Sequence, residues 1–365
     1  MWWFYCSTLS ISLLYLVLIL FFYIGWRRIS VFVPIEYQTI RTKISVVVAC
    51  RNEEDHIRQL IGCMAQQSFQ NFELILVNDH SVDATLNYIL AAKESFPQIQ
   101  LVNATGFGKK NALKEGILHS SNKLIITTDA DCMPSYHWLE SIVCFYRKYR
   151  SDLIICPVKL SGKDSLFSYL QVLEFTSLVA AAAGSSGVGM PILCNGANLA
   201  FTKKCWLESQ DDLHNEEQSG DDMFLMESVK KRGGTIRFLK SESSFISTKQ
   251  ADTLGEFIRQ RRRWTSKSPA FTDFHIIVTA CIILAINALS LSLLTASFFN
   301  HSVLITFGSL FFFKYALDTF FLYAVSKFFQ LNNIWYYSLL LSAIYPFYIV
   351  FVAFSTFLFK PKKWK

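Results

Sequence analysis

The sequence predicts an α/β domain built around a largely parallel sheet, preceded by one membrane helix and followed by about three more. Hydrophobic residues make up 52% of the 365 residues and charged residues only 17%, which is unusual for a soluble enzyme. Between apolar runs near the two ends of the chain, short β-branched runs alternate with polar stretches, the pattern of a parallel sheet with crossover helices. A membrane protein with one polar central domain fits both observations.

The first element is an almost uninterrupted apolar run from Trp2 to Trp26. At about 1.5 Å per residue, a helix of this length crosses a hydrocarbon core of about 30 Å, so residues 1–26 are predicted to form a transmembrane helix. Arg27 and Arg28 follow it, and their charges favour a cytoplasmic position for the chain beyond them. A signal peptide is disfavoured because the run is long, lacks a basic start and has no small-residue cleavage site.

The central domain, residues 43–249, contains four apolar runs that predict strands. These runs are Ile44–Ala49, Leu74–Val77, Ile99–Val102 and Leu124–Thr127. Nine cysteines are scattered singly without a CxxC pair, so the sequence offers neither a zinc site nor a disulfide framework. Such cysteine usage suits a reducing compartment.

Residues 250–273 are predicted to form an amphipathic segment at the membrane surface, and residues 274–360 the C-terminal membrane helices. The predicted spans are Ile276–Phe299, Val303–Val325 and Ile334–Phe359. Three crossings from a cytoplasmic domain would leave the basic tail outside, against the positive-inside rule. The tail lysines are Lys360, Lys362, Lys363 and Lys365. The last segment, interrupted by Pro346, is therefore the candidate for lying in the interface or re-entering the membrane.

The charges within and beside these spans favour membrane contact over other functions. Lys314 and Asp318 are four residues apart, so they can neutralise each other on one helix face, an interpretation that outweighs a transport role. A net charge of +7 is compatible with nucleic acid binding, but the basic residues show no interleaved base-stacking aromatic pattern. Contact with a membrane surface explains them better, and no nucleic acid partner is expected.

Polar residues follow the first three predicted strands. Asn52 and Glu53 lie at the carboxyl end of the first strand, where open α/β sheets bind ligands; an ordinary capped loop explains this segment equally well. Asp79 ends the second strand, and its carboxylate can accept hydrogen bonds from a nucleobase or a ribose hydroxyl. The segment GFGKKNALKEG follows the third. Its glycines and Lys109 can meet a diphosphate, whereas the P-loop spacing of an ATPase is absent.

The sharpest local signal is Asp129-Ala130-Asp131, directly after the strand LIITT. Two acids separated by one residue can hold a hard divalent cation, which neutralises a nucleotide diphosphate. A turn with two solvated acids is the alternative. It is disfavoured because a charge directly after a buried strand is costly without a partner.

Two further motifs have a functional and a purely structural interpretation. Asp221-Asp222 opens an amphipathic helix; helix-start charges explain the pair taken alone, but beside a metal site a carboxylate can deprotonate an acceptor hydroxyl. The segment QRRRW precedes the C-terminal apolar region, where a basic interfacial helix is a strong alternative. In the functional interpretation, Arg263 steadies diphosphate charge and Trp264 offers its ring to an acceptor sugar or lipid.

Taken in order, these motifs resemble those of the inverting family 2 glycosyltransferases and the ceramide glucosyltransferases, whose catalytic domain has the GT-A fold. The resemblance spans about Ile44 to Trp264, and seven motifs in the right order are specific although each is weak alone. They are VVVACRNEE, LILVNDHSVDAT, GKKNAL, TTDAD, NGANLAF, GDD and QRRRW. Many relatives carry an acid in place of Asn78 and Glu-Asp in place of Asp221-Asp222. Asp221-Asp222 still retains the second acid, which is the proposed base.

The resemblance implies a donor site. Asp79 would contact the uracil or ribose of the nucleotide, and Asp129 and Asp131 would bind the diphosphate with its Mg²⁺ or Mn²⁺. The expected donor-binding set is completed by Asn52, Glu53 and Lys109.

The resemblance also implies the chemistry. Asp222 would be the base of a single displacement that inverts the anomeric carbon. Gln260, Arg263 and Trp264 match the Q-x-x-R-W motif that lines the acceptor site in processive synthases and ceramide glucosyltransferases.

The leading hypothesis is an integral membrane enzyme that moves one sugar from a nucleotide sugar, a UDP-sugar, to a lipid or lipid-linked glycan acceptor. Its catalytic domain would face the cytoplasm, and a bacterial inner membrane suits such a chain. About four hydrophobic segments are fewer than a polysaccharide channel needs, so a processive polysaccharide synthase is the alternative within enzymes. A catalytically silent sugar-nucleotide-binding membrane protein predicts donor binding without turnover, and the large polar block leaves a transporter little room.

Overall fold

The computed structural model describes residues 2–34, 42–213 and 220–358. These residues divide into two compact units, each described by itself. The sheet unit comprises Ile29–Ser161 and Leu193–Lys249, and the helical unit comprises Met1–Arg28, Gly162–Ile192 and Gln250–Lys362. The tail lysines lie outside the described residues.

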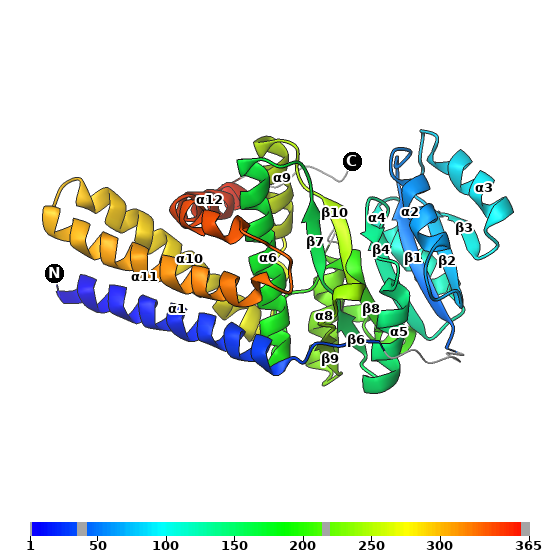
Figure 1. The fold of residues 1–365 in the computed structure, drawn as a ribbon, viewed down its shortest axis with the longest axis horizontal. Helices are drawn as coiled ribbons and strands as arrows, with labels where there is room; N and C mark the ends of the chain where they lie inside the picture. The colour runs from blue at the N-terminus through cyan, green and yellow to red at the C-terminus, as the bar shows by residue number, and fades with distance from the viewer. Residues whose placement is uncertain (1, 35–41, 214–219, 359–365) are drawn as a thin grey trace. The chain divides into compact units, whose positions relative to one another are not determined.

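The sheet unit is built on a seven-stranded sheet with the order β3-β2-β1-β4-β8-β6-β9 (Figure 1). The strands, in chain order, are β1 Ile44–Cys50, β2 Phe72–Asn78, β3 Ile99–Asn103, β4 Leu124–Asp129, β6 Leu153–Ile155, β8 Leu199–Thr202 and β9 Ile236–Phe238. β3, β2, β1 and β4 pair in parallel, whereas β8 is antiparallel to both of its neighbours. The predicted α/β domain with a largely parallel sheet is confirmed.

Helices and a smaller sheet surround these strands. The helices are α2 Ile57–Ala65, α3 Thr85–Ser95, α4 Lys109–His119, α5 Trp138–Tyr149, α7 Lys203–Glu208 and α8 Asp221–Lys231. The smaller sheet has the order β5-β10-β7, with β5 Met133–Pro134, β7 Val158–Ser161 and β10 Ile246–Lys249. Short 3-10 turns lie at Gly196–Asn198, Gln210–Asp212 and Glu242–Ser244.

Continuous aliphatic runs explain why these strands form the core. Val46, Val47 and Val48 of β1 are fully buried, as are Leu74 and Ile75 of β2, because strands covered on both faces need apolar side chains on both. The parallel register pairs Cys50 with Asn78 and Ala49 with Asp129. The carboxyl ends of β1, β2 and β4 therefore meet at one edge of the sheet.

The helical unit contains six α-helices and two 3-10 turns among the described residues. The helices are α1 Trp2–Arg28, α6 Leu166–Gly187, α9 Leu254–Thr265, α10 Phe274–Ser297, α11 His301–Ser326 and α12 Ser338–Leu358. The 3-10 turn Ser268–Ala270 follows α9, and the 3-10 turn Ile334–Tyr337 precedes α12. Five helices in the described ranges are long and apolar enough to cross a membrane, namely all of these except α9. The predicted membrane helices, one N-terminal and about three C-terminal, are confirmed.

The sequence interpretation missed α6 as a separate membrane-type helix. It assigned residues 43–249 to one domain, whereas Gly162–Ile192 groups with the helical unit. The helix is rich in Ala, Gly and Ser and carries Glu174, so its apolar signal is weaker than those of the other long helices. It packs closely on α1, because a Cβ added at Gly25 would lie 1.7 Å from the Gly184 carbonyl oxygen.

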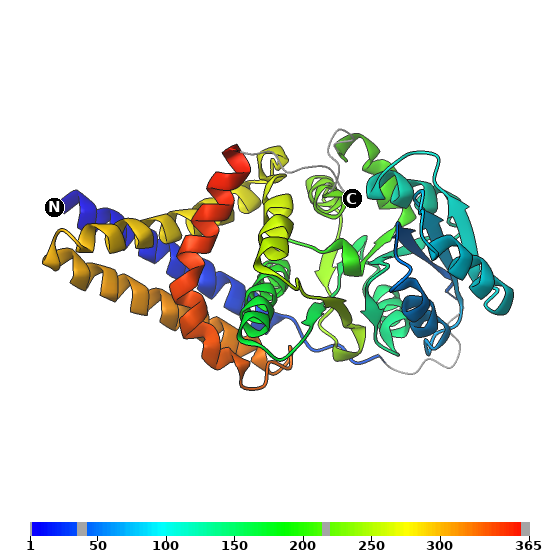
Figure 2. The same cartoon turned by 90° about the horizontal axis from the view of Figure 1, so that it is seen from above.

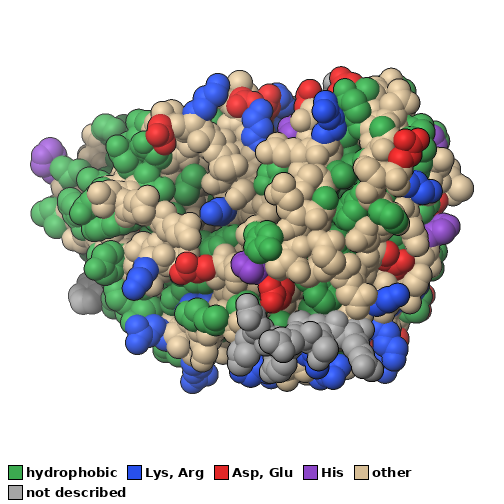
Figure 3. All heavy atoms as spheres, turned by 45° about the vertical axis from the view of Figure 1, so that its right-hand side comes forward, with side chains coloured by type: hydrophobic (Ala, Val, Ile, Leu, Met, Phe, Trp, Pro, Cys, Tyr) green, Lys and Arg blue, Asp and Glu red, His purple; other side chains and the backbone are tan. Residues whose placement is uncertain are grey.

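Helix α12 differs in direction from the other C-terminal helices. Figures 1 and 2 show α10 and α11 as a hairpin alongside α1, with the α10–α11 connection at the same end as the beginning of α1. α12, drawn in red, runs across this hairpin in Figure 2 and is seen nearly end-on in Figure 1. It remains helical through Pro346. Hydrophobic side chains gather at this end of the molecule in the space-filling view (Figure 3, left).

Candidate active site

The Asp79 carboxylate lies in the loop after β2 and is fully buried. Both of its oxygens accept from the Gly108 N–H, at 3.1 and 3.0 Å, and the Arg51 guanidinium lies 3.6 Å away. Gly108 has a φ of +97°, a conformation that glycine adopts without strain. This bond fixes the GFGKK segment beside the ends of β1 and β2.

Lys109 begins α4 and reaches the end of β4. Its Nζ donates to Asp129 Oδ1 at 2.6 Å. Both side chains are only half-buried, so they remain accessible to a ligand. The structure thus brings together two residues of the predicted donor set that are 20 positions apart.

Asn52 and Glu53 follow β1 and join the loop after β2. Asn52 Oδ1 accepts from the Val82 N–H at 2.9 Å, and the Glu53 N–H donates to Thr85 Oγ1 at 2.7 Å. Burial raises the pKa of Glu53, and the negative charge of Asp131 adds to the effect. The Glu53 carboxylate lies 3.3 Å from His56 Nδ1, while the side chain of Asn52 holds the loop.

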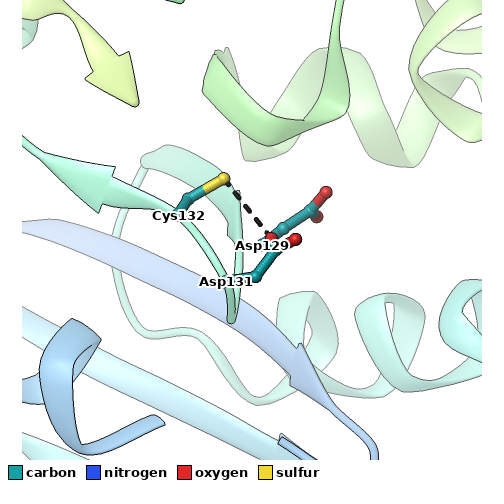
Figure 4. Close-up of side chains that lie close together, drawn as sticks. All are labelled: Asp129, Asp131 and Cys132. Atoms are coloured by element: carbon teal, nitrogen blue, oxygen red, sulfur yellow. Dashed lines mark hydrogen bonds between the residues drawn. The ribbon is translucent and has the colours of Figure 1, made fainter. Parts of the chain in front are cut away.

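Asp129, Asp131 and Cys132 form a compact group directly after β4 (Figure 4). One ligand atom from each residue lies within 4.8 Å of the other two, and Cys132 Sγ lies 3.7 Å from Asp131 Oδ1. Burial raises the pKa of Asp131, and the nearby charge of Asp129 raises it further. Two carboxylates held this close, with repulsion between them, are suited to a divalent cation.

Asp222, in the first turn of α8, is held by two backbone donors. Its Oδ2 accepts from the Gly196 N–H at 2.8 Å, and its Oδ1 from the Met223 N–H at 2.9 Å. The neighbouring Asp221 lies 3.3 Å from Lys110 Nζ, and burial raises its pKa. Of the two adjacent acids, Asp221 is paired with a cation, whereas Asp222 is oriented by neutral N–H groups.

A mainly apolar pocket opens beside Asp222 within the sheet unit. Its wall includes Thr127, Gly196, Asp221 and Asp222, together with a cluster of apolar side chains. These apolar side chains include Leu113, Ile117, Leu199, Phe201, Trp206 and Leu225. The base candidate thus borders open space on one side.

Two models of known protein families match this chain. The model of glycosyl transferase family 2 matches residues 45–192, and that of glycosyl transferase family group 2 matches residues 124–358, more than half of the chain. The chain belongs to this family. The resemblance to the family 2 glycosyltransferases, inferred from the seven motifs, is confirmed.

Two curated relatives of this glycosyltransferase chain match it in part. The poly-beta-1,6-N-acetyl-D-glucosamine synthase of Staphylococcus aureus (strain MSSA476) is 24% identical over 226 residues, covering 60% of this chain and 53% of the relative. An uncharacterized glycosyltransferase of Haemophilus influenzae is 31% identical over 106 residues, covering 29% of this chain and 33% of the relative. The chain therefore spans about half the length of the synthase and a third of the other relative.

A solved structure supports the same fold. The mannosyltransferase of Pyrobaculum calidifontis, in complex with GDP-Man and Mn²⁺, superposes with a TM-score of 0.56 at 16% identity. The superposition covers 97% of this chain and 99% of the mannosyltransferase. The expected GT-A fold of the glycosyltransferase is confirmed.

Gln260, Arg263 and Trp264 lie on α9, in the helical unit. Positions i, i+3 and i+4 share one helix face, so the three side chains face the same way. Gln260 Oε1 accepts from Arg261 Nη1, and the Arg261 guanidinium lies 4.2 Å from the centre of the Trp264 ring. Arg263 is exposed. The remaining predicted site residues all lie in the sheet unit.

Sequence reasoning missed several residues that complete the site. Cys132 follows the acidic pair directly, and this position is the signal that could have found it. Arg51 immediately precedes the predicted Asn52. Thr127 belongs to the TTDAD motif, but its bond to the Gly196 carbonyl oxygen joins residues 69 positions apart, and no local pattern reveals that bond.

Proposed function

We propose that this chain transfers a sugar from a nucleotide-sugar donor, a UDP-sugar, to a lipid or lipid-linked acceptor with inversion at the anomeric carbon. The observation that carries the proposal is the grouping of Asp79, Lys109, Asp129 and Asp131 at the carboxyl ends of adjacent parallel strands. Family membership supports the reaction class, and Asp222 supplies a base within the same unit.

The donor site follows from these side chains. The buried Asp79 carboxylate, bonded to the Gly108 N–H, borders the position of the base or ribose in this scheme, and Lys109 meets the negative charge of the diphosphate. The oxygens of Asp129 and Asp131 fit a hard divalent cation, Mg²⁺ or Mn²⁺. When bound, that ion neutralises the diphosphate and makes it a better leaving group.

The transfer is a single displacement. The acceptor oxygen forms a bond to the anomeric carbon while the bond from that carbon to the diphosphate oxygen breaks, and the nucleoside diphosphate leaves. The acceptor hydroxyl loses its proton to Asp222, whose carboxylate is held by Gly196 and Met223. Attack from the face opposite the leaving group inverts the configuration, so an α-linked donor gives a β-glycoside.

The helical unit supports a membrane arrangement with three crossings. In this arrangement α1, α10 and α11 cross, and α12 lies in the interface with its exposed stripe toward the acyl chains. The stripe consists of Leu340, Ile344, Phe347, Phe351 and Phe354. The end of α12 then lies on the side of Arg27 and Arg28, as the positive-inside rule requires for the basic residues that follow it. In a variant whose exposed Cys6 and Cys281 are replaced by Ser, a cysteine added after Lys365 should react with an impermeant maleimide only from the cytoplasmic side; reaction from outside would refute this topology.

A processive polysaccharide synthase is the second candidate function. It is favoured by the match to the poly-beta-1,6-N-acetyl-D-glucosamine synthase. The two functions share the donor site and differ in product length. Five candidate membrane helices in the described ranges leave little room for a polymer channel formed by one copy, so single transfer ranks first.

The test is turnover by the purified full-length chain in lipid nanodiscs. A panel of UDP-sugars, with GDP-mannose for comparison, is incubated with a membrane lipid extract and with Mg²⁺, Mn²⁺ or EDTA. Metal-dependent lipid products carrying one sugar establish the proposal and identify the donor, whereas a ladder of long chains supports the synthase. Asp222→Asn serves as the inactive control. Nucleotide binding without any product in the wild type would contradict both functions.

A further inference from the structure

The backbone of Gly196 connects the strand that carries the metal-binding acids with the base candidate. Its N–H donates to Asp222 Oδ2 at 2.8 Å, and its carbonyl oxygen accepts from Thr127 Oγ1 at 3.0 Å. Thr127 lies on β4, two residues before Asp129. Gly196 is therefore bonded to β4 through its carbonyl oxygen and to Asp222 through its N–H.

The turn that contains Gly196 is also held by the side chains of Asn195 and Asn198. Asn195 Oδ1 accepts from the Ala197 N–H at 3.0 Å, closing the first turn of the 3-10 segment. Asn198 is fully buried. Its Nδ2 donates to the carbonyl oxygens of Pro157 and Ser244 at 2.7 and 3.0 Å, and its Oδ1 accepts from Trp138 Nε1 at 2.8 Å. With Asn198 anchored, the side chain of Thr127 fixes the other end of the turn.

The Asp222 carboxylate needs a hydrogen-bond donor that holds it in place, because it borders a pocket. The pocket wall contains Thr127, Gly196 and Asp222 themselves, so the carboxylate has open space into which it can rotate. A general base must present its lone pair to the proton in a defined direction, and small displacements of reacting groups cost large factors in rate. The bond from Gly196 sets the plane of the carboxylate.

We propose that Thr127 is a positioning residue for Asp222, acting through the Gly196 backbone. The inference rests on the proposed role of Asp222 as the base. Thr127 touches neither substrate nor metal in this scheme; its hydroxyl holds the turn that orients the carboxylate. Loss of the hydroxyl should therefore lower kcat while leaving donor binding in place.

The experiment compares Thr127→Val with two matched variants in the nanodisc assay. Thr127→Val keeps the shape of the side chain and removes the donor, whereas Thr127→Ser keeps the donor. Ser151→Ala removes another buried hydroxyl of the sheet unit, which has no hydrogen-bond partner among the described residues. Ser151 precedes β6 and belongs to neither the acidic group nor the pocket.

We expect Thr127→Val to lower kcat by roughly 10- to 100-fold, with the KM for the donor and the metal-dependent UDP affinity within about twofold of wild type. Thr127→Ser should recover most of kcat, and Ser151→Ala should match the wild type. An unchanged kcat in Thr127→Val, an equal loss in Ser151→Ala or no recovery in Thr127→Ser overturns the proposal. If Thr127→Val does not fold, Thr127→Ser and Thr127→Ala, which differ by one hydroxyl, carry the same comparison.

Asp222→Asn separates this inference from the proposed function. If that variant retains turnover, Asp222 is not the base and the proposed mechanism fails. If it is inactive while Thr127→Val turns over normally, the base assignment stands and only the positioning role of Thr127 fails.

Discussion

The two units treat their charged side chains in opposite ways. In the sheet unit, Asp129 and Asp131 lie together at the end of a strand, and burial raises the pKa of Asp131. In the helical unit, the buried charges are paired: Arg261 Nε donates to Glu174 Oε1 at 3.0 Å, and Lys314 Nζ lies 2.6 Å from Asp318 Oδ2. Neutralised charges in an apolar unit indicate structure, whereas two acids that repel each other at the end of a strand indicate a ligand.

The units also differ in what brings their elements together. Aliphatic side chains fill the core of the sheet unit. In the helical unit, α1 and α6 approach backbone to backbone at Gly25 and Gly184, as small residues permit in membrane proteins. Substitutions in the two units should therefore lower activity or stability for different physical reasons.

The largest effect is expected at the acids of the sheet unit. Asp222→Asn should lower turnover on the order of 10³-fold and spare UDP binding, because the side chain acts only on the acceptor proton. Asp129→Ala combined with Asp131→Ala should remove the Mn²⁺-dependent part of UDP binding. Titration calorimetry with UDP, in the presence and absence of Mn²⁺, distinguishes the two variants by their effect on UDP binding. Equal loss of binding in both variants would contradict the division of roles.

The second effect concerns the contact between α1 and α6. Gly184→Ala places a methyl group 2.4 Å from the Phe22 carbonyl oxygen, so the helices must separate, at a cost of about 3 kcal/mol or more. Gly308→Ala is the matched control, because a methyl group on α11 meets nothing within 4 Å. The yield of folded protein and its thermal midpoint in detergent measure both. A Gly184→Ala variant as stable as Gly308→Ala would show that the close approach is not needed.

The third-largest effect is expected from breaking a buried ion pair, compared with breaking an exposed one. Glu174 also accepts from Tyr348 Oη at 3.2 Å, so it links α6 to both α9 and α12. Glu174→Gln should destabilise the helical unit by about 3 kcal/mol, because Arg261 is left buried without its counter-charge. Glu208→Gln removes an exposed pair, 3.8 Å from Lys204, and should change stability by less than about 1 kcal/mol. Similar shifts of the thermal midpoint in the two variants would refute the distinction.

Most of the fold could be predicted from the sequence because its signals are local. The strand runs ending at Asp79 and Asp129 are continuous and apolar, and the parallel register then brings those ends together. Helix α6 was missed because Ala, Gly and Glu174 dilute its apolar signal inside an α/β pattern. The bonds from Thr127 and Asn198 connect distant segments through buried hydroxyl and amide groups, and only the packed structure shows them.

The smallest effect is a pair of opposite pH dependences in the sheet unit. Burial raises the pKa of Asp221, with Lys110 opposing and Asp222 adding to the effect. The folded chain then binds more protons than the unfolded chain above about pH 4, so this contribution to stability is present in acid and lost as pH rises through the raised pKa. Bonds from Ser228 and Arg232 lower the pKa of Asp212, and its contribution is instead lost as pH falls.

These signs are tested by thermal midpoints measured between about pH 2 and pH 8 in EDTA, because the contribution of Asp212 is lost only below about pH 4. Relative to wild type, Asp221→Asn should gain stability as pH rises, because the variant has no buried carboxyl to ionise. Asp212→Asn should lose stability at neutral pH and approach the wild type in acid. Since Mn²⁺ is absent, neither trend depends on the metal site. Parallel curves for both variants would mean that the environments of these two acids do not differ as the structure indicates.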